Sequence, residues 1–156
     1  MKGVLPISFG PELVWIWSRD LKKHIGKRVR KLEGGESWVA VSVSGNAVLL
    51  LSWGAQNCGI AVISDKEKKD LIASAKQAPP IVNALKSNIS GAELTDVCQL
   101  NRDRIIRLTF TKTIGAGFSN TRHLTLEMME RYSNLIFTDE NNTVLETAKH
   151  IHPADN

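Results

Sequence analysis

This sequence has little cysteine and no long hydrophobic run, and each shortage excludes a class of protein. Two cysteines in 156 residues are too few to staple a small disulfide-rich domain. No apolar run approaches the ~20 residues of a membrane span, and the longest candidate, Ala47 to Trp53, has the length of a strand. The N-terminus carries one Lys but no apolar signal region, which predicts a cytoplasmic protein without a membrane segment.

Potential metal ligands are few and scattered. Cys58 and Cys98 form no CxxC motif, which favours free buried thiols in a reducing cytoplasm over a disulfide or a metal pair. His150 and His152 point the same way on an extended chain, but no third ligand follows at an ordinary spacing. We therefore expect no metal and no other cofactor.

Sequence motifs of catalysis are missing too. There is no GxSxG elbow. Gly115-Ala116-Gly117 lacks the Gly-Lys-Ser/Thr and the helix of a phosphate loop, so we expect a hairpin loop there. The chain is expected to have no catalytic residues and not to be an enzyme.

What the sequence does have is the composition of one globular domain. Hydrophobic residues make up 42% and charged residues 23% of the chain, proportions that exclude a disordered protein. A chain of 156 residues buries roughly two-thirds of its unfolded surface, which is enough for one core.

The charge is basic and unevenly placed. The net charge is +4, with a pI near 9.2, and the excess lies between positions 19 and 31. This basic cluster consists of Arg19, Lys22, Lys23, Lys27, Arg28, Arg30 and Lys31, with only Asp20 against it. Such a cluster predicts a surface that follows an RNA backbone. The alternative is a solvated helix face followed by an edge strand that charge protects from pairing.

The region from Leu100 to Pro153 predicts four successive strands in a meander. Apolar and polar residues alternate, as in a half-buried sheet. The apolar side comprises Ile106, Leu108 and Phe110 in the first strand and Leu124, Leu126 and Met128 in the second. The third run, 134–138, and the fourth, 143–151, are joined by residues 139–142, which tolerate the positive φ of a tight hairpin.

The first hundred residues mix helices and strands. Pro11 begins a helix whose apolar stripe is Leu13, Ile16, Trp17 and Leu21. Further helices follow Ser64 and Pro80, and the strands expected are 28–32, 37–44, 47–51, 59–63 and 92–100. The predicted fold class is α+β, a mostly antiparallel β-sandwich of eight or so strands with two or three helices.

The four tryptophans could stack on bases, but helical and strand spacing favours packing for most of them. They are Trp15, Trp17, Trp38 and Trp53. Trp17 falls on the apolar stripe of its helix, Trp15 falls off it, and Trp38 follows a turn. We expect core or sheet packing for the set, with Trp38 as the exposed exception.

Several segments resemble the N-terminal domain of the NFACT family, the fibronectin-binding protein A-like ribosome-associated quality control factors. They are Asp103-Arg104-Ile105-Ile106, His123-Leu124, Glu127-Met128-Met129, Arg131 to Ile136, Thr138 to Asn141 and Lys149-His150-Ile151. The resemblance extends more loosely to Pro79 to Lys86 and Asp20 to Lys31. It implies one NFACT N-terminal-type domain over residues 1–156, as a fragment of a longer multidomain protein. It also implies a fold similar to the N-terminal domain of formamidopyrimidine-type DNA glycosylases.

The resemblance also assigns a site. It implies that Asp103 and Arg104 hold transfer RNA, an idea that suits a guanidinium able to bind phosphate or a base edge beside a carboxylate. The alternative is a structural ion pair at a strand end. The family opens with Phe-Asp-Gly, whereas this chain has Ser8-Phe9-Gly10 and lacks that carboxylate.

The function implied is a non-catalytic RNA-binding module of a ribosome quality control factor. Its expected partners are tRNA and the large ribosomal subunit with an obstructed nascent chain, during C-terminal tail addition. The Arg and Lys residues from Arg19 to Arg30 are expected to contact the RNA backbone. One alternative is a fibronectin-binding surface adhesin. Another, less favoured, is a glycosylase-like DNA repair enzyme, because this chain begins Met1-Lys2-Gly3 and not with the proline amine and acid that such enzymes use.

Overall fold

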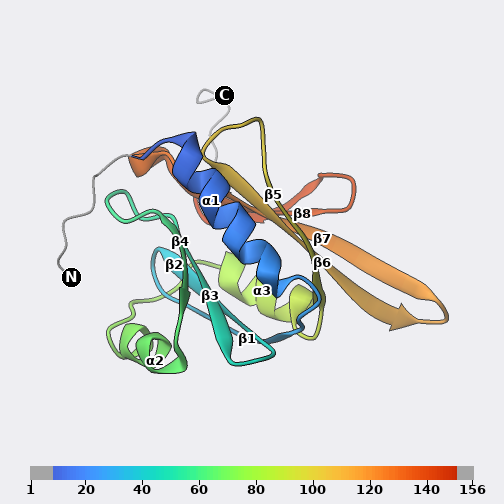
Figure 1. Ribbon diagram of the computed structural model, residues 1–156. Coiled ribbons are helices and arrows are strands. Elements are labelled where there is room, and N and C mark those ends of the chain that lie inside the picture. Colours follow the sequence, from blue (N-terminus) through green and yellow to red (C-terminus); the bar gives the residue numbers. More distant parts are fainter. Residues whose placement is uncertain (1–8, 151–156) are drawn as a thin grey trace.

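The protein, as a computed structural model that describes residues 9–150, has three α-helices and nine strands within that range (Figure 1). The helices are α1 (Pro11–Leu21), α2 (Asp65–Ala73) and α3 (Ile81–Ile89), with short 3₁₀ helices η1 (Lys22–His24) and η2 (Glu130–Tyr132). The strands are β1 (Val29–Gly34), β2 (Trp38–Val43), β3 (Ala47–Ser52), β4 (Gly59–Ile63), β5 (Glu93–Gln99), β6 (Ile105–Gly115), β7 (Phe118–Glu127), β8 (Asn134–Asp139) and β9 (Val144–Thr147). Ser8, Ile151 and His152, as well as the opening Met1-Lys2-Gly3, lie outside the described residues.

The strands form two antiparallel sheets that follow the order of the chain. One sheet has the order β1-β2-β3-β4 and the other β5-β6-β7-β8-β9, so both are meanders. The α+β class and the C-terminal meander are therefore confirmed. Gly115-Ala116-Gly117 connects β6 to β7 as the expected hairpin loop.

The inner faces of both sheets share one core with α1 and α3. Ile106, Leu108 and Phe110 are buried there, as the alternation predicts, and so are Leu124 and Leu126. Figure 1 shows α1 and α3 lying between the four-stranded and the five-stranded sheet. The alternation of apolar and polar residues along β6 and β7 thus determines which face of these strands is turned toward the core.

The four-stranded sheet is covered on its second face as well. Trp38, Ala40 and Val48 are buried in a smaller cluster, to which Leu71 of α2 contributes. This explains why β3 is apolar on both faces. It lies between β2 and β4, with the core on one side and α2 on the other.

A buried lysine fixes α2 on this sheet. Ser64 and Glu67 form a capping box that starts the helix. One turn later Lys68, only 6% exposed, places its Nζ 2.8 Å from Glu33 Oε1 of β1 and 3.3 Å from Asp65 Oδ1. Its Nζ also donates a hydrogen bond to Ser42 Oγ of β2, at 3.1 Å. Burial lowers the pKa of Lys68, but these carboxylates outweigh it, so the pKa is raised.

The predicted stripe of α1 is only partly right. Leu21 is buried and Trp17 packs against the core, as predicted, but Leu13 and Ile16 are exposed, and Val14 and Ser18 are buried in their place. Both sets recur at helical spacing, so periodicity alone did not separate them. Ser18 could occupy the buried face because its hydroxyl donates to the carbonyl of Trp15 within the helix.

Three smaller predictions are also corrected. Trp38 is 8% exposed, because β2 is covered by α2, and the exposed tryptophan is Trp15. Cys58 and Cys98 are free, as expected, but half-buried. The last strand is shorter than the predicted run 143–151, since β9 ends at Thr147.

Candidate nucleic-acid interface

The turn between β5 and β6, residues 100–104, forms an exposed rim of the five-stranded sheet. The backbone nitrogen of Leu100 donates to the Ile105 carbonyl, and that of Asp103 donates to the Leu100 carbonyl. Asn101 and Arg102 both have left-handed backbone conformations, with φ of 55° and 54°. Two such residues in succession turn the chain sharply and leave the Arg102 side chain exposed.

Asp103 and Arg104 lie on this rim and are half-buried, but they do not pair through their side chains. The Nη1 of Arg104 donates to Glu130 Oε2 at 2.8 Å, so the carboxylate partner of the guanidinium comes from η2. Asp103 Oδ1 instead accepts from the backbone nitrogen of Arg104, at 2.7 Å. The two side chains of this step therefore make separate contacts.

The surroundings of Arg104 are acidic. Glu127 of β7 lies opposite Ile105, next to the rim. Burial, and then the charge of Asp103, raises the pKa of the Glu127 carboxyl. With Glu130 paired to the guanidinium and Asp103 close enough to Glu127 to raise its pKa, the rim offers acceptors for amino groups more than a binding site for phosphate.

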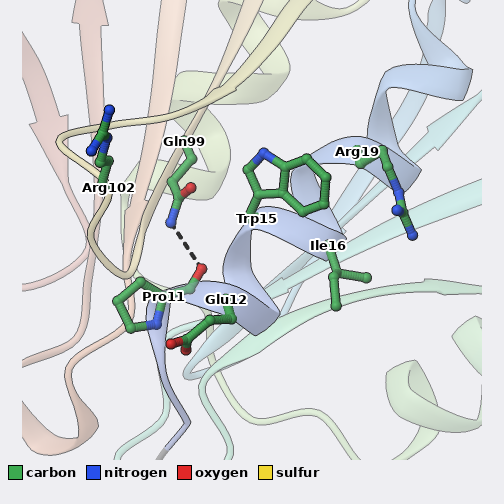
Figure 2. Close-up of a pocket in the computed structure, with 7 residues that line it drawn as sticks. All are labelled: Pro11, Glu12, Trp15, Ile16, Arg19, Gln99 and Arg102. Atoms are coloured by element: carbon green, nitrogen blue, oxygen red, sulfur yellow. Dashed lines mark hydrogen bonds between the residues drawn. The ribbon is translucent and has the colours of Figure 1, made fainter.

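Gln99 joins the rim to the start of α1. Its Nε2 donates to the carbonyl of Pro11 at 2.9 Å and to that of Asp103 at 2.8 Å. Figure 2 shows the first of these bonds crossing from the end of β5 to the first turn of α1. Segments far apart in sequence are thereby held side by side.

An open depression of about 440 Å³ lies where α1 meets the rim (Figure 2). Its lining consists of Pro11, Glu12, Trp15, Ile16, Arg19, Gln99 and Arg102. Trp15 is 53% exposed, and the guanidinium of Arg19 lies over its ring, 5.3 Å from the centroid. Of these lining residues, the sequence analysis had named only Arg19 as a site residue. The position of Trp15 off the apolar stripe of its helix was the one sign in the sequence that Trp15 could be exposed and belong to a site.

Apart from Arg19, which lies on α1, the residues of the basic cluster follow the other end of that helix. Lys22 and Lys23 lie in η1 and not on α1, and both are exposed. Lys27 Nζ contacts His24 Nδ1 at 2.9 Å. Burial, and then the charges of Lys27 and Lys23, lowers the pKa of His24. These cations therefore share one small region of the surface.

Arg28 and Arg30 continue the cluster along the edge of the four-stranded sheet, and both are exposed. Arg28 Nη1 donates to the Gly91 carbonyl at 3.2 Å. Arg30 falls in the irregularity of register between Val29 and Lys31. Both interpretations of the cluster, RNA contact and protection of the β1 edge, fit this placement.

The two charged regions lie at opposite ends of one helix. The nitrogen of Gly26 donates to the Leu94 carbonyl at the start of β5, while Gln99 at its end is bonded to Pro11. α1 therefore runs antiparallel to β5. Its 11 residues span about 16 Å, with Arg19 between the two regions.

Phe9, which the sequence comparison with the family's Phe-Asp-Gly opening singled out, makes an apolar contact. Its ring packs against Trp17, with centroids 5.0 Å apart and an edge-to-face angle of 66°. Within residues 9–150 no group of three or more His, Cys, Asp or Glu side chains is arranged to hold a metal ion. No helix in that range is long and apolar enough to cross a membrane.

Comparison with protein families gives one match. The model of the NFACT N-terminal and middle domains matches residues 19–156. A search of curated proteins finds no match.

Solved structures share the fold. The N-terminal domain of the fibronectin-binding protein PavA from Streptococcus pneumoniae superposes with a TM-score of 0.78 at 21% identity, over 93% of this chain and 55% of that chain. The N-terminal part of the fibronectin/fibrinogen-binding protein from Streptococcus suis gives a TM-score of 0.75 at 20% identity, over 93% of this chain and 55% of that chain. The fibrinogen-binding protein of Staphylococcus aureus gives 0.74 at 22%, over 90% and 51%. This chain spans about half the length of each.

Proposed function

We propose, because this chain belongs to the NFACT family, that it is a non-catalytic RNA-binding module of a ribosome-associated quality control factor. Its partners are tRNA and the large ribosomal subunit with an obstructed nascent chain, in the cytoplasm. This module binds RNA and does not itself catalyse a reaction. We further propose that, when a whole protein adds a C-terminal tail, this module supplies the contacts to tRNA.

The observation that carries the proposal is the arrangement along α1. The rim with Asp103 and Arg104 lies at one end of the helix, and the lysines of the basic cluster lie at the other. A helix of about 16 Å separates them. One polyanion the size of tRNA can contact both regions at once.

The two regions suit different parts of an RNA. Exposed lysines attract phosphates, which supply the salt-dependent part of the affinity. The carboxylates of Asp103 and Glu127 at the rim repel phosphate but accept hydrogen bonds from the exocyclic amino groups of bases. In this proposal the basic cluster binds the backbone, and the rim contacts an unpaired base.

The test is a gel-shift titration with bulk tRNA and with large ribosomal subunits. Arg104→Ala removes a charged hydrogen-bond donor, so we expect affinity for tRNA to fall on the order of 10- to 100-fold. Glu130→Gln is the matched control, because it weakens the ion pair while keeping the guanidinium available. It should bind tRNA at least as well as wild type.

A purely structural ion pair predicts another pattern. Both substitutions would then lower the free energy of unfolding, and neither would change tRNA affinity in the folded protein. Urea unfolding of both variants separates the two cases. Absence of tRNA and subunit binding by the wild type at low salt would refute the proposal itself.

A second candidate is fibronectin binding, because two of the similar solved structures are named as fibronectin-binding proteins. At 20–21% identity these structures support the shared fold and not the shared partner. Immobilised fibronectin and cell fractionation test it; retention on fibronectin together with a location outside the membrane would favour it over RNA. The similarity to DNA glycosylases stays a prediction. Cleavage of a strand in a lesion-containing duplex would support the repair activity of such enzymes.

A further inference from the structure

Trp15 differs from the other tryptophans of the chain. Trp38 and Trp53 are buried, and Trp17 packs half-buried against Phe9. Trp15 is 53% exposed on the outer side of α1, within the depression beside the rim. A flat indole exposed in a hollow is a surface on which another flat group can stack.

The ring is held in place by cation–π contact. The guanidinium of Arg19 lies 5.3 Å from its centroid, and Figure 2 shows the indole between Arg19 and Gln99. Arg19 meets Asp20 only at 3.9 Å, and its side chain is largely exposed. Its charge therefore remains available to a phosphate while its plane orders the indole.

Two more polar groups border the hollow. Within residues 9–150, Arg102 has no ion pair and no side-chain hydrogen bond. The Nε2 of Gln99 is committed to two carbonyls, which leaves its Oε1 as an acceptor on the side of Trp15 (Figure 2). The hollow thus combines an aromatic face with a guanidinium on each side and an amide oxygen.

We propose that this depression is a stacking site for one unpaired nucleobase, with Trp15 as the platform and Arg19 and Arg102 on the flanking phosphates. The inference rests on the proposed RNA binding and deepens it by naming a base-binding site next to Asp103 and Arg104. The occupant is single-stranded RNA, since bases inside a duplex are already stacked and do not expose a face.

Charge and shape favour this occupant over an apolar peptide. The lining has two arginines against one acid, Glu12, so a ligand with anionic groups is attracted. The depression is open and shallow around one aromatic ring, which fits a planar base better than a helix with several apolar anchors.

The test uses the full chain and a 12-nucleotide oligoadenylate, with duplex RNA of equal length as the comparison. Oligoadenylate is expected to quench tryptophan fluorescence, and the duplex is expected to bind without this quenching. Trp15→Leu should weaken oligoadenylate binding on the order of 5- to 100-fold. Trp15→Phe should keep most of the affinity but lose the quenching, since phenylalanine stacks without the signal.

The dependence on salt separates stacking from charge. Trp15→Leu removes no charge, so the slope of log K against log salt should stay as in wild type. Arg102→Ala should reduce that slope by about 0.7, the value for one phosphate contact on a single strand. Phe118→Ala, at the exposed tip of the β6–β7 hairpin, is the control for loss of an exposed aromatic and should change neither quantity.

The outcomes distinguish this inference from the proposed function. If wild type binds tRNA but Trp15→Leu binds oligoadenylate with unchanged affinity, the stacking site is wrong while RNA binding stands. Binding of tRNA without any binding of oligoadenylate likewise overturns the stacking site alone. If wild type binds neither, both proposals fail.

Discussion

Two sets of cations in this molecule contrast sharply in their surroundings. Lys68 is 6% exposed and is surrounded by Glu33, Asp65 and Ser42. Lys22 and Lys23 are exposed, and among residues 9–150 their one ion-pair partner is Asp20, whose Oδ1 lies 3.9 Å from Lys23 Nζ. A buried charge must be paired to be tolerated, whereas an exposed pair at this distance adds little to stability.

The contrast separates cations that hold the fold from cations that remain available. Lys68 joins α2 to β1 and β2, so its charge is satisfied inside the protein. The lysines of η1 and the guanidinium of Arg102 keep their charge at the surface. Substitution of Lys68 should therefore change the free energy of unfolding, whereas substitution of the surface cations should change the affinity for RNA.

The largest expected effect is on stability. Lys68→Met leaves the partly buried carboxylate of Glu33 with only the more distant and exposed Lys31, so we expect a loss of about 1–3 kcal/mol in the free energy of unfolding. Urea unfolding measures it. Lys66→Met, on the exposed side of the same helix, is the matched control and should stay within about 0.5 kcal/mol of wild type. Equal losses of stability in the two variants would show that the buried Lys68 does no more for the fold than the exposed Lys66.

The next effect is on binding. Changing both Lys22 and Lys23 to Gln should lower tRNA affinity and reduce the slope of log K against log salt by about 1.4 to 1.8, the value for two phosphate contacts. Stability should remain within about 0.5 kcal/mol, because neither side chain is buried. Gel-shift titrations at several salt concentrations provide the slope. An unchanged slope would favour the interpretation of these lysines as a solvated surface.

The smallest effect concerns pH. Burial is the first cause that lowers the pKa of both His24 and His123, followed by Lys27 and Lys23 for the first and Arg107 for the second. Their pKa in the folded state thus lies below the ordinary 6.5, and the unfolded chain binds protons more readily. The stability that the two neutral histidines contribute is fully present above pH 6.5. It is lost as the pH falls through 6.5 toward their lower pKa values in the folded state.

Urea midpoints at pH 8 and pH 5.5 measure this decline. His123→Asn can still bond the hydroxyl of Thr109 and should flatten part of the pH dependence. The contribution of Lys68 should not change over the same range, because its pKa is raised and its stabilisation is lost only at pH values above the ordinary 10.5. A pH dependence that is the same in His123→Asn would remove His123 as a cause.

The strands were more predictable than the orientation of the first helix. In β6 and β7 each side chain alternates with the next, so one apolar series identified the buried face. In α1 the apolar residues are not confined to one face, and the prediction that included Leu21 correctly also included Leu13 and Ile16 wrongly and left out Val14. Only packing against β5 and the core decided which of these side chains face inward, and the same packing exposed Trp15.

In the candidate site, too, one part could be predicted from the sequence and another could not. The Asp103-Arg104 step and the basic cluster were visible as residue types in sequence. The ion pair of Arg104 with Glu130 joins residues 26 positions apart, and Gln99 reaches Pro11 across 88 positions. Such partners are set by strand pairing and chain reversal, which residue types alone do not specify.

The sequence by itself determined the strand faces, the helix starts and the concentration of positive charge, because these depend on neighbours within a few residues. The tertiary structure alone decided which tryptophan faces solvent, which lysine is buried and which carboxylate pairs with Arg104. Those outcomes depend on contacts between segments distant in the chain, where burial and pairing free energies outweigh local propensity.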